Sequence, residues 1–198
     1  MAIDIKEIKR LKDLTGVGMA DAKKALVESD GNFDKALEAM RIKGQAKADK
    51  KSEREAKEGL IGSYVHSNRI GVLVEVNCET DFVARTDGFK NFVHDISMQV
   101  AASSPIFVSR GDVDKKTLDK EKDLIKQELK ASGKPGKMLD KITEGKLGKY
   151  YSEVCLLEQP YIKNPNQTVG DLQKEIVSKL GENIVIRRFA RLELGEVQ

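Results

Sequence analysis

Three side chains of the types used in nucleophilic catalysis occur close together in the first half of this sequence. Cys78 could serve as a nucleophile, His66 as its base and Asp81 as the group that orients the base. Cys78, however, ends a β-branched, apolar run, which is typical of a small buried hydrophobe. His66 falls at the opposite end of the hairpin that this run predicts. We therefore expect no covalent chemistry, and an enzyme centred on Cys78 is the third alternative.

Metal and phosphate motifs are weak in this sequence. No cluster of His, Cys, Asp or Glu has the spacing of a metal site. Glu79 and Asp81 could supply oxygen ligands, but two carboxylates do not make a calcium loop. Gly16-Val17-Gly18 does not indicate a phosphate loop, because no strand precedes it and no Gly-Lys-Ser/Thr follows. We predict neither a bound metal nor a cofactor.

The most apolar run of the chain stops at residues 77–83, Asn-Cys-Glu-Thr-Asp-Phe-Val. Residues 70–76 are expected to form a buried strand, and Thr80 or Asp81 is placed to cap a following helix. Phe82 would then stand beside an acid at an exposed strand-to-helix corner, where it could act as a wedge for another protein. The alternative is a capped helix with Phe82 in the core, and residue types alone favour it.

Residues 1–43 are predicted to form a three-helix bundle. Apolar stripes recur at helical spacing, with turn-rich separators at 15–19 and 29–32. A module this small is marginal alone and resembles a ubiquitin-associated (UBA-like) bundle, which is a docking unit. The stripe residues are Ile5, Ile8, Leu11, Leu14, Ala22, Ala25, Leu26, Phe33, Ala36, Leu37 and Met40.

Residues 44–58 are predicted to form a charged, solvated helical linker and a domain boundary. Residues 43–57 hold six basic and three acidic side chains, so they carry the whole of the net charge of +3. Attraction of this run to RNA is an alternative interpretation. The rest of the chain is balanced in charge and no aromatics interleave the basic residues, so we expect no direct nucleic-acid binding.

Residues 59–198 are predicted to form an α+β core. Residues 59–78 indicate a β-hairpin that turns at 67–69. The last strand, residues 184–194, alternates so that apolar side chains share one face, and beside the hairpin it would complete a small three-stranded antiparallel sheet packed against helices. The apolar face comprises Ile184, Ile186, Ala190, Leu192 and Leu194. The helices are expected over 87–102, 114–131, 136–157 (after a turn at 132–135) and from 168 to before 183.

Cysteine usage and hydropathy indicate a cytoplasmic protein. Cys78 and Cys155 make no disulfide framework and fit a reducing compartment. No apolar stretch approaches the ~20 residues needed to span a bilayer. The N-terminus opens as an amphipathic helix and lacks the apolar core of a signal peptide. We therefore expect no membrane partner.

Four longer motifs follow one another from end to end of the chain. They are KDLTGVGMADAKKAL at 12–26, GSYVHSNRIGVLV at 62–74, NCETDFVA at 77–84 and GENIVIRRF at 181–189. Together they resemble the bacterial elongation factor Ts family, over the whole chain. The chain has room for one core subdomain, so it is similar to the short members that work as homodimers. Because neither cysteine lies in the final strand, any dimer should depend on packing.

The resemblance implies a translation factor without covalent chemistry. It would bind the GDP form of elongation factor Tu and promote GDP release by perturbing the Mg²⁺ and phosphate site. It implies that Thr80, Asp81, Phe82 and Val83 displace the magnesium ion, with Phe82 as the wedge. The bundle would dock on the GTPase and supply affinity rather than the rate of release. The expected docking residues are Gly16, Val17, Gly18, Met19, Lys23 and Lys24, with His66 as a further partner residue.

A second function class stays open from the residues. A stand-alone RNA-binding or ribosome-associated protein would use the basic linker and would bind with a steep salt dependence. The confinement of the charge excess to one linker disfavours this alternative.

Overall fold

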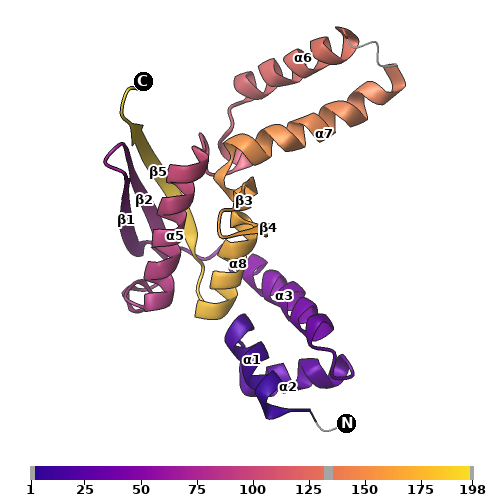
Figure 1. Cartoon of the computed structure of the whole chain (residues 1–198), viewed down its shortest axis with the longest axis vertical. Helices are drawn as coiled ribbons and strands as arrows, with labels where there is room; N and C mark the ends of the chain where they lie inside the picture. The colour runs from indigo at the N-terminus through magenta and orange to yellow at the C-terminus, as the bar shows by residue number, and fades with distance from the viewer. Residues whose placement is uncertain (1–2, 132–135, 197–198) are drawn as a thin grey trace.

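The computed structural model describes residues 3–131 and 136–196, and for 130, 131 and 136–140 only the backbone is considered. The chain forms an N-terminal bundle, a core in which helices cover one face of a sheet, and a helical hairpin that projects from the core (Figure 1). This is the α+β class that the sequence predicted. None of the helices in the described part of the chain is both long and apolar enough to cross a membrane.

The bundle contains the three predicted helices, α1 (Ile5–Thr15), α2 (Met19–Glu28) and α3 (Phe33–Asp49). The Asp4 and Asn32 side chains cap α1 and α3, and Gly16 ends α1 with a φ of 69°, in the left-handed region that glycine adopts most easily. The predicted stripes meet in one small core, except that Ile5 and Leu14 are exposed. These two residues lie in the first and last turns of α1.

Helix α3 does not stop at residue 43 but continues to Asp49 and packs against α8 (Val169–Leu180). The Asp49 carboxylate lies 2.9 Å from the Lys174 ammonium, and the Gln45 amide donates to Asp171 at 3.3 Å. The helix predicted through residue 58 is therefore wrong beyond Asp49. Residues 50–53 form turns because the chain folds back onto the core there. The domain division at residues 43 and 58 stays a prediction.

The sheet consists of β1 (Glu58–His66), β2 (Ile70–Cys78) and β5 (Val185–Glu193), in the order β1-β2-β5 with antiparallel pairing. The hairpin predicted from sequence is confirmed, with His66 opposite Ile70. Ser67 and Asn68 both have positive φ, as a tight hairpin turn requires, and with Arg69 they form the three-residue connection between the strands. Cys78 lies opposite Glu58 at the far end of the hairpin.

A β-bulge in β5 places the side chains that follow it on the face opposite to the one that the sequence alternation predicts. Glu75 pairs with Arg188 but Val76 pairs with Ile186, so Arg187 is an extra residue in β5. Ile184 and Ile186 are buried as predicted, whereas Ala190, Leu192 and Leu194 are exposed. The prediction of a single apolar face is thus wrong beyond Ile186, because one inserted residue shifts a period-2 pattern by one position.

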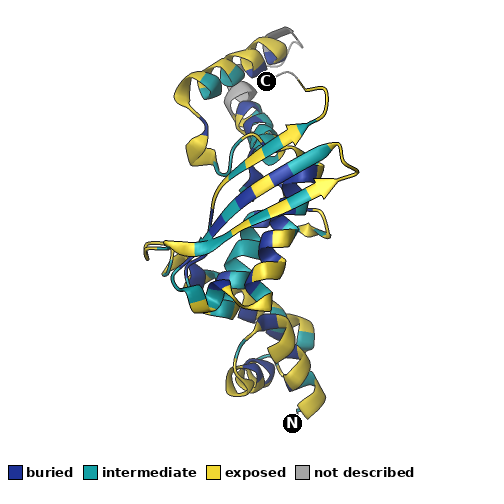
Figure 2. Ribbon diagram, turned by 90° about the vertical axis from the view of Figure 1, so that its left-hand side faces the viewer, coloured by how far each residue is buried: buried dark blue, intermediate teal, exposed yellow. Residues whose placement is uncertain are grey.

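Helices α5 (Asp87–Ser103) and α8 cover one face of the sheet, and the other face is open (Figures 1 and 2). Gly62 permits the close approach of β1 to α5, because a Cβ there would lie 2.4 Å from Val93 Cγ1. The main core joins the inner side of β2 to α5, α8 and the start of β5. Its members include Val72, Val74, Val76, Cys78, Phe89, Phe92, Val93, Ile96, Val100, Val169, Val177, Ile184 and Ile186.

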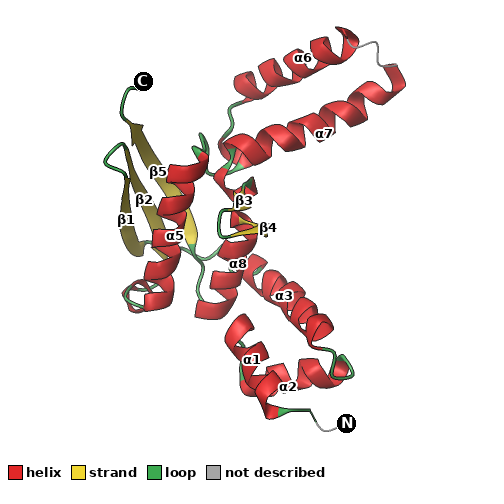
Figure 3. Ribbon diagram, viewed as in Figure 1, coloured by secondary structure: helices red, strands yellow, loops and turns green. Residues whose placement is uncertain are grey.

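The projecting hairpin consists of α6 (Lys115–Ala131) and α7 (Gly136–Val154), with a small core around Ile125, Leu129 and Leu147 (Figure 3). The turn predicted at 132–135 lies outside the described residues. Helix α7 ends at Val154, three residues before the predicted end, and a 3-10 turn (Leu156–Glu158) follows. A short ribbon of β3 (Pro160–Tyr161) and β4 (Asn164–Thr168) then leads into α8.

Candidate partner-binding site

The strand-to-helix turn at Thr80–Val83, here called the 80–83 corner, presents Phe82 to solvent. It follows β2 directly, and the helix α4 (Asp81–Ala84) is a single turn. Phe82 is 79% exposed, whereas Ala84 is buried and Val83 packs against the main core. The alternative that Phe82 is a core residue is therefore wrong. An aromatic side chain held outside the core on a fixed turn is a candidate contact for another protein.

Asp81 and Arg85 form an ion pair beside Phe82. The Asp81 carboxylate lies 2.7 Å from the Arg85 guanidinium, one helical turn further on; the Arg85 side chain is largely exposed and that of Asp81 about half exposed. An exposed pair of this kind contributes little to stability, about 0–1 kcal/mol. The surface of the 80–83 corner therefore carries an aromatic ring, an acid and that acid's own counter-ion.

Two threonine caps fix the course of the backbone through this segment. The Thr80 hydroxyl accepts a hydrogen bond from the Val83 backbone N–H at 3.4 Å, and Thr86 accepts one from Phe89 N–H at 3.3 Å to start α5. The sequence predicted a cap at Thr80 or Asp81, and Thr80 has this role. Each cap accepts a backbone N–H in the first turn of its own helix, α4 or α5, where no intrahelical acceptor is available.

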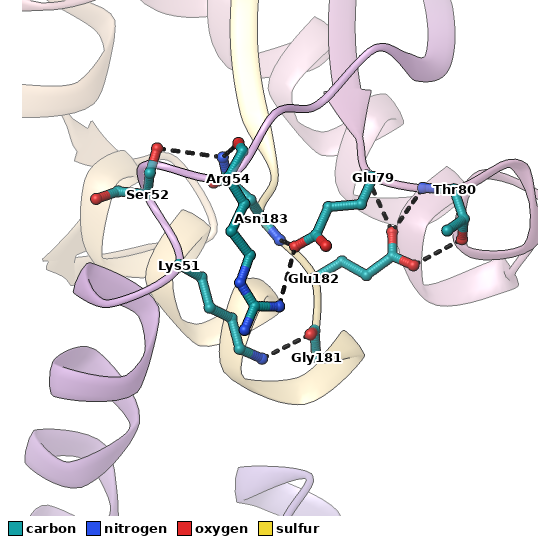
Figure 4. A network of polar contacts seen from close by, with 8 residues as sticks. All are labelled: Lys51, Ser52, Arg54, Glu79, Thr80, Gly181, Glu182 and Asn183. Atoms are coloured by element: carbon teal, nitrogen blue, oxygen red, sulfur yellow. Dashed lines mark hydrogen bonds and ion pairs between the residues drawn. The ribbon is translucent and has the colours of Figure 1, made fainter.

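Segments remote in sequence close around the 80–83 corner (Figure 4). The Glu79 carboxylate accepts a hydrogen bond from the Asn183 backbone N–H at 2.6 Å and lies 3.6 Å from the Arg54 guanidinium. The Asn183 side chain donates to the backbone oxygens of Arg54 at 2.6 Å and Ser52 at 3.3 Å. Sequence reasoning missed these contacts. Residues 181–183 belong to the motif GENIVIRRF at 181–189, but no periodicity in the sequence indicates a contact between them and Glu79.

The proposed nucleophile, base and orienting acid do not come together. His66 and Cys78 lie at opposite ends of the hairpin, about 27 Å apart at the rise of an antiparallel strand. The Cys78 thiol is buried and donates a hydrogen bond to the Thr80 backbone oxygen at 3.1 Å. Burial, and secondarily the charge of Glu182, raises the pKa of Cys78 to about 11. Cys78 is therefore a poor nucleophile near neutral pH, and this constellation is excluded by geometry.

The predicted docking residues of the bundle lie apart from the 80–83 corner in sequence and are divided between two environments. Gly16 faces α8, because a Cβ there would lie 2.6 Å from Lys179 Cγ. Val17 packs in the bundle core, while Gly18 and Met19 are exposed at the start of α2. Lys23 and Lys24 are exposed on α2, and the Lys24 ammonium lies 3.7 Å from Glu28. All of this set except Val17 is exposed, and Gly18, Met19 and the two lysines are the members on or next to α2.

His66 lies at the end of β1, beside the β1–β2 turn. Its Nδ1 is 3.1 Å from the Tyr64 hydroxyl, and the Tyr64 ring contacts the His94 ring edge-on at 5.9 Å between centroids. Both histidines of the chain thus flank one tyrosine, on a surface separated from the 80–83 corner by the length of the sheet. A partner that touches both must extend along the sheet.

The open face of the sheet carries exposed apolar side chains, together with the ion pair of Glu75 and Arg188. Leu73 is 53% exposed and Leu192 is 62% exposed, and the register places them on adjacent strands. We call this surface the outer face. Its large apolar side chains are Ile61, Val65, Leu73, Leu192 and Leu194. Within the described residues, no group of three or more His, Cys, Asp or Glu side chains could hold a metal ion, on this face or elsewhere.

The fold and the site present three features suited to contact with another protein: a small bundle, a sheet face with exposed apolar side chains and an exposed aromatic corner. The chain belongs to the elongation factor Ts family. The family model described as Elongation factor TS matches residues 6–176. The chain is therefore a translation elongation factor, as the four motifs implied.

Individual relatives match almost end to end. The chain is 54% identical over 195 residues to "Elongation factor Ts" of Thermoanaerobacter sp. (strain X514), covering 98% of this chain and 96% of the relative. It is 53% identical to the protein of the same name from Caldanaerobacter subterraneus subsp. tengcongensis, with 98% of each covered. The relative from Thermodesulfovibrio yellowstonii is 49% identical over 198 residues, covering 100% of this chain and 99% of that protein.

Proposed function

We propose that this chain is a guanine nucleotide exchange factor that binds the GDP form of elongation factor Tu and promotes GDP release. The observation that carries the proposal is the exposure of Phe82 on a turn fixed by two caps and by side chains from other segments. An exposed phenyl group costs free energy in water, so it favours a partner crevice that can bury it.

The energy available from Phe82 is sufficient for catalysis of release. Burying a phenylalanine contributes about 1.5–3 kcal/mol. Each 1.36 kcal/mol removed from a barrier accelerates a step about tenfold. Phe82 inserted beside the magnesium site of the GTPase would thus accelerate GDP release about ten- to a hundredfold.

Neighbouring residues assist this wedge in the proposed mechanism. Asp81 brings a carboxylate to the polar network that holds the magnesium ion, and it leaves Arg85 to do so. Thr80 sets the turn, and Val83 connects it to the core. No bond is made or broken, so the activity is not enzymatic and needs no cofactor. Because coupling between two ligands is reciprocal, returning nucleotide displaces the factor.

The bundle supplies affinity in this proposal. Gly18, Met19, Lys23 and Lys24 form an exposed edge at the start and middle of α2. They dock on the GTPase, while His66 touches a second part of it from the far end of the sheet. The accessible cations on α2 suit an acidic partner surface.

A homodimer forms through the outer face in the same proposal. Two sheets pack face to face about 10 Å apart, and a two-fold axis lets the same apolar patch serve both subunits. Leu73 and Leu192 are central to this surface. Two chains would then present two exchange surfaces, and neither buried cysteine is needed for the contact.

Binding of RNA through residues 44–58 is the competing function. It is disfavoured because Lys51 donates to the Gly181 backbone oxygen at 2.6 Å and the Arg54 guanidinium lies 3.6 Å from Glu79. Half-exposed cations already engaged within the chain are poorly disposed to collect phosphates. We place the protein in the cytoplasm, with elongation factor Tu and without a membrane or nucleic-acid partner.

Release of a fluorescent GDP from elongation factor Tu tests the proposal. The protein is added at several substoichiometric concentrations, and multiple turnovers of release per molecule are expected. A folded sample that leaves the release rate unchanged would overturn the proposed function. Binding to RNA with a steep salt dependence would then support the competing one.

A further inference from the structure

The turn between α8 and β5 holds the 80–83 corner through one side chain, Glu182. Gly181 ends α8 with a left-handed φ of 81°, which sends the chain sharply toward β5. Glu182 follows at once and reaches across to the end of β2 (Figure 4).

Both carboxylate oxygens of Glu182 are used. Oε2 accepts hydrogen bonds from the backbone N–H groups of Glu79 and Thr80, each at 3.0 Å. Oε1 accepts the Thr80 hydroxyl at 2.6 Å. A negatively charged acceptor that binds two amides and a hydroxyl is among the stronger polar contacts available to a protein.

The contact on the Thr80 hydroxyl determines how this residue caps α4. A hydroxyl has one hydrogen to donate and lone pairs to accept. Its hydrogen points to Glu182, so a lone pair remains for the Val83 N–H. A helix of four residues has no stability of its own, because nucleation of a helix is unfavourable. The direction of α4, and with it that of Phe82, depends on contacts from outside the helix.

Glu79 and Glu182 make reciprocal contacts, because the carboxylate of each accepts a hydrogen bond from the backbone of the other segment. Glu182 accepts from the backbone that carries Glu79, and Glu79 accepts from the backbone N–H of Asn183, the residue after Glu182. Asn183 is buried and its side chain holds the backbone at Ser52 and Arg54. The end of β2, the start of β5 and the segment that follows α3 are thereby joined.

We propose that Glu182 is a positioning residue for nucleotide exchange: it holds Thr80 so that Phe82 and Asp81 leave the 80–83 corner in a fixed direction. This inference rests on the proposed function. Glu182 itself does not touch the partner. Loss of the Glu182 carboxylate therefore affects the step in which Phe82 enters the partner site. It leaves docking by the bundle intact.

Glu182→Gln is the variant that tests this role. A glutamine has one acceptor oxygen, and its NH₂ group cannot accept from a backbone amide. At least one of the two amides or the Thr80 hydroxyl loses its acceptor, while the shape of the side chain is kept. We expect the saturating rate of GDP release to fall about tenfold, the range for loss of a hydrogen bond to a charged group. The half-saturating concentration should change less than about twofold.

Hydrogen exchange provides a readout that is independent of activity. The amides of residues 79–84 should exchange faster in E182Q than in the wild type, with β2 and α5 unchanged. Lys51→Met is the matched control, because Lys51 joins the segment after α3 to Gly181 without touching the corner. K51M should show wild-type release and wild-type exchange at residues 79–84.

The outcomes separate this inference from the function on which it rests. Wild-type protein that does not accelerate release overturns the proposed function. Active wild type together with an E182Q protein that reaches the same saturating rate overturns the positioning role. If E182Q does not fold, Thr80→Val tests the same hydrogen bond from the other side. T80V should also lower the saturating rate with little change in the half-saturating concentration, and a wild-type rate would overturn the inference.

Discussion

The Asp81 carboxylate lies 2.7 Å from the Arg85 guanidinium, on the same one-turn segment that exposes Phe82. In the free protein, Asp81 is therefore already neutralised by its own chain. To act on the polar network of a partner it must leave Arg85, and the ion pair opposes that step.

Arg85→Gln is expected to raise the saturating rate of GDP release about twofold. An exposed i,i+4 pair contributes about 0.3–0.5 kcal/mol, and this is the energy that Asp81 no longer has to give up. Thermal unfolding should be unchanged. Stopped-flow release of fluorescent GDP measures the rate, and Arg85→Lys, which keeps the cation, should resemble the wild type. A fall in the rate for R85Q would instead assign Arg85 a direct contact with the partner.

Phe82→Ala should lower the saturating rate about ten- to a hundredfold without loss of stability. The side chain is 79% exposed, so its removal leaves no cavity, whereas burial in a partner would be lost. The matched control is Ile106→Ala, which removes an apolar side chain of similar exposure at another site. Equal release rates for F82A and the wild type, at equal binding, would contradict the wedge.

Lys23→Glu together with Lys24→Glu should raise the half-saturating concentration and leave the saturating rate nearly unchanged. Both side chains are exposed on α2, and reversing their charge weakens docking to an acidic surface. Point substitutions are preferable to removal of residues 1–43, because α3 continues past residue 43 and packs on α8. A collapse of the saturating rate would show that the bundle takes part in the release step itself.

Cys78 should resist alkylation in the folded protein. Its buried thiol should also lower the free energy of unfolding as the pH rises. The pKa of its thiol is raised to about 11, compared with about 8.5 in an unfolded chain. Between these values the unfolded state releases a proton that the folded state keeps, so rising pH favours unfolding by about 1.4 kcal/mol per pH unit. Denaturant titrations of the wild type and Cys78→Ala at several pH values from 8 to 11 give the free energy of unfolding at each pH. The wild type should show the steeper fall of this free energy with rising pH. Equal slopes, or rapid reaction of native Cys78 with iodoacetamide, would contradict the burial.

Leu73→Asp should convert the proposed dimer to monomers. Leu73 lies at the centre of the outer face and is 53% exposed in the single chain, so a charge there spares the fold but opposes packing of two sheets. Sedimentation velocity at several concentrations measures the association. Ile106→Asp changes another exposed apolar residue, outside the three strands of the sheet, and should leave the dimer intact. A wild-type chain that sediments as a monomer throughout would remove the dimer from the proposal.

Local patterns in the sequence determined most of the elements. The strand of 70–78, the tight turn after His66 and the helices from 87 and 169 are specified by neighbours within a few residues, through alternation, caps and turn residues. The four motifs likewise determined the family. These features were predictable because hydrophobic period and backbone capping are short-range properties.

Only the tertiary structure decided which side chains are available. The bulge at Arg187 turns Leu192 outward, although the sequence alternation, broken only by Arg188, places it on the face of Ile184 and Ile186. The bulge exists only in the pairing of β5 with β2. Phe82 is exposed because Val83 and Ala84 fill the adjacent core space. Glu182 meets Thr80 across 102 residues of sequence. Register, competition for core volume and long-range hydrogen bonds depend on elements that no local window contains, so they emerge only when the chain has folded.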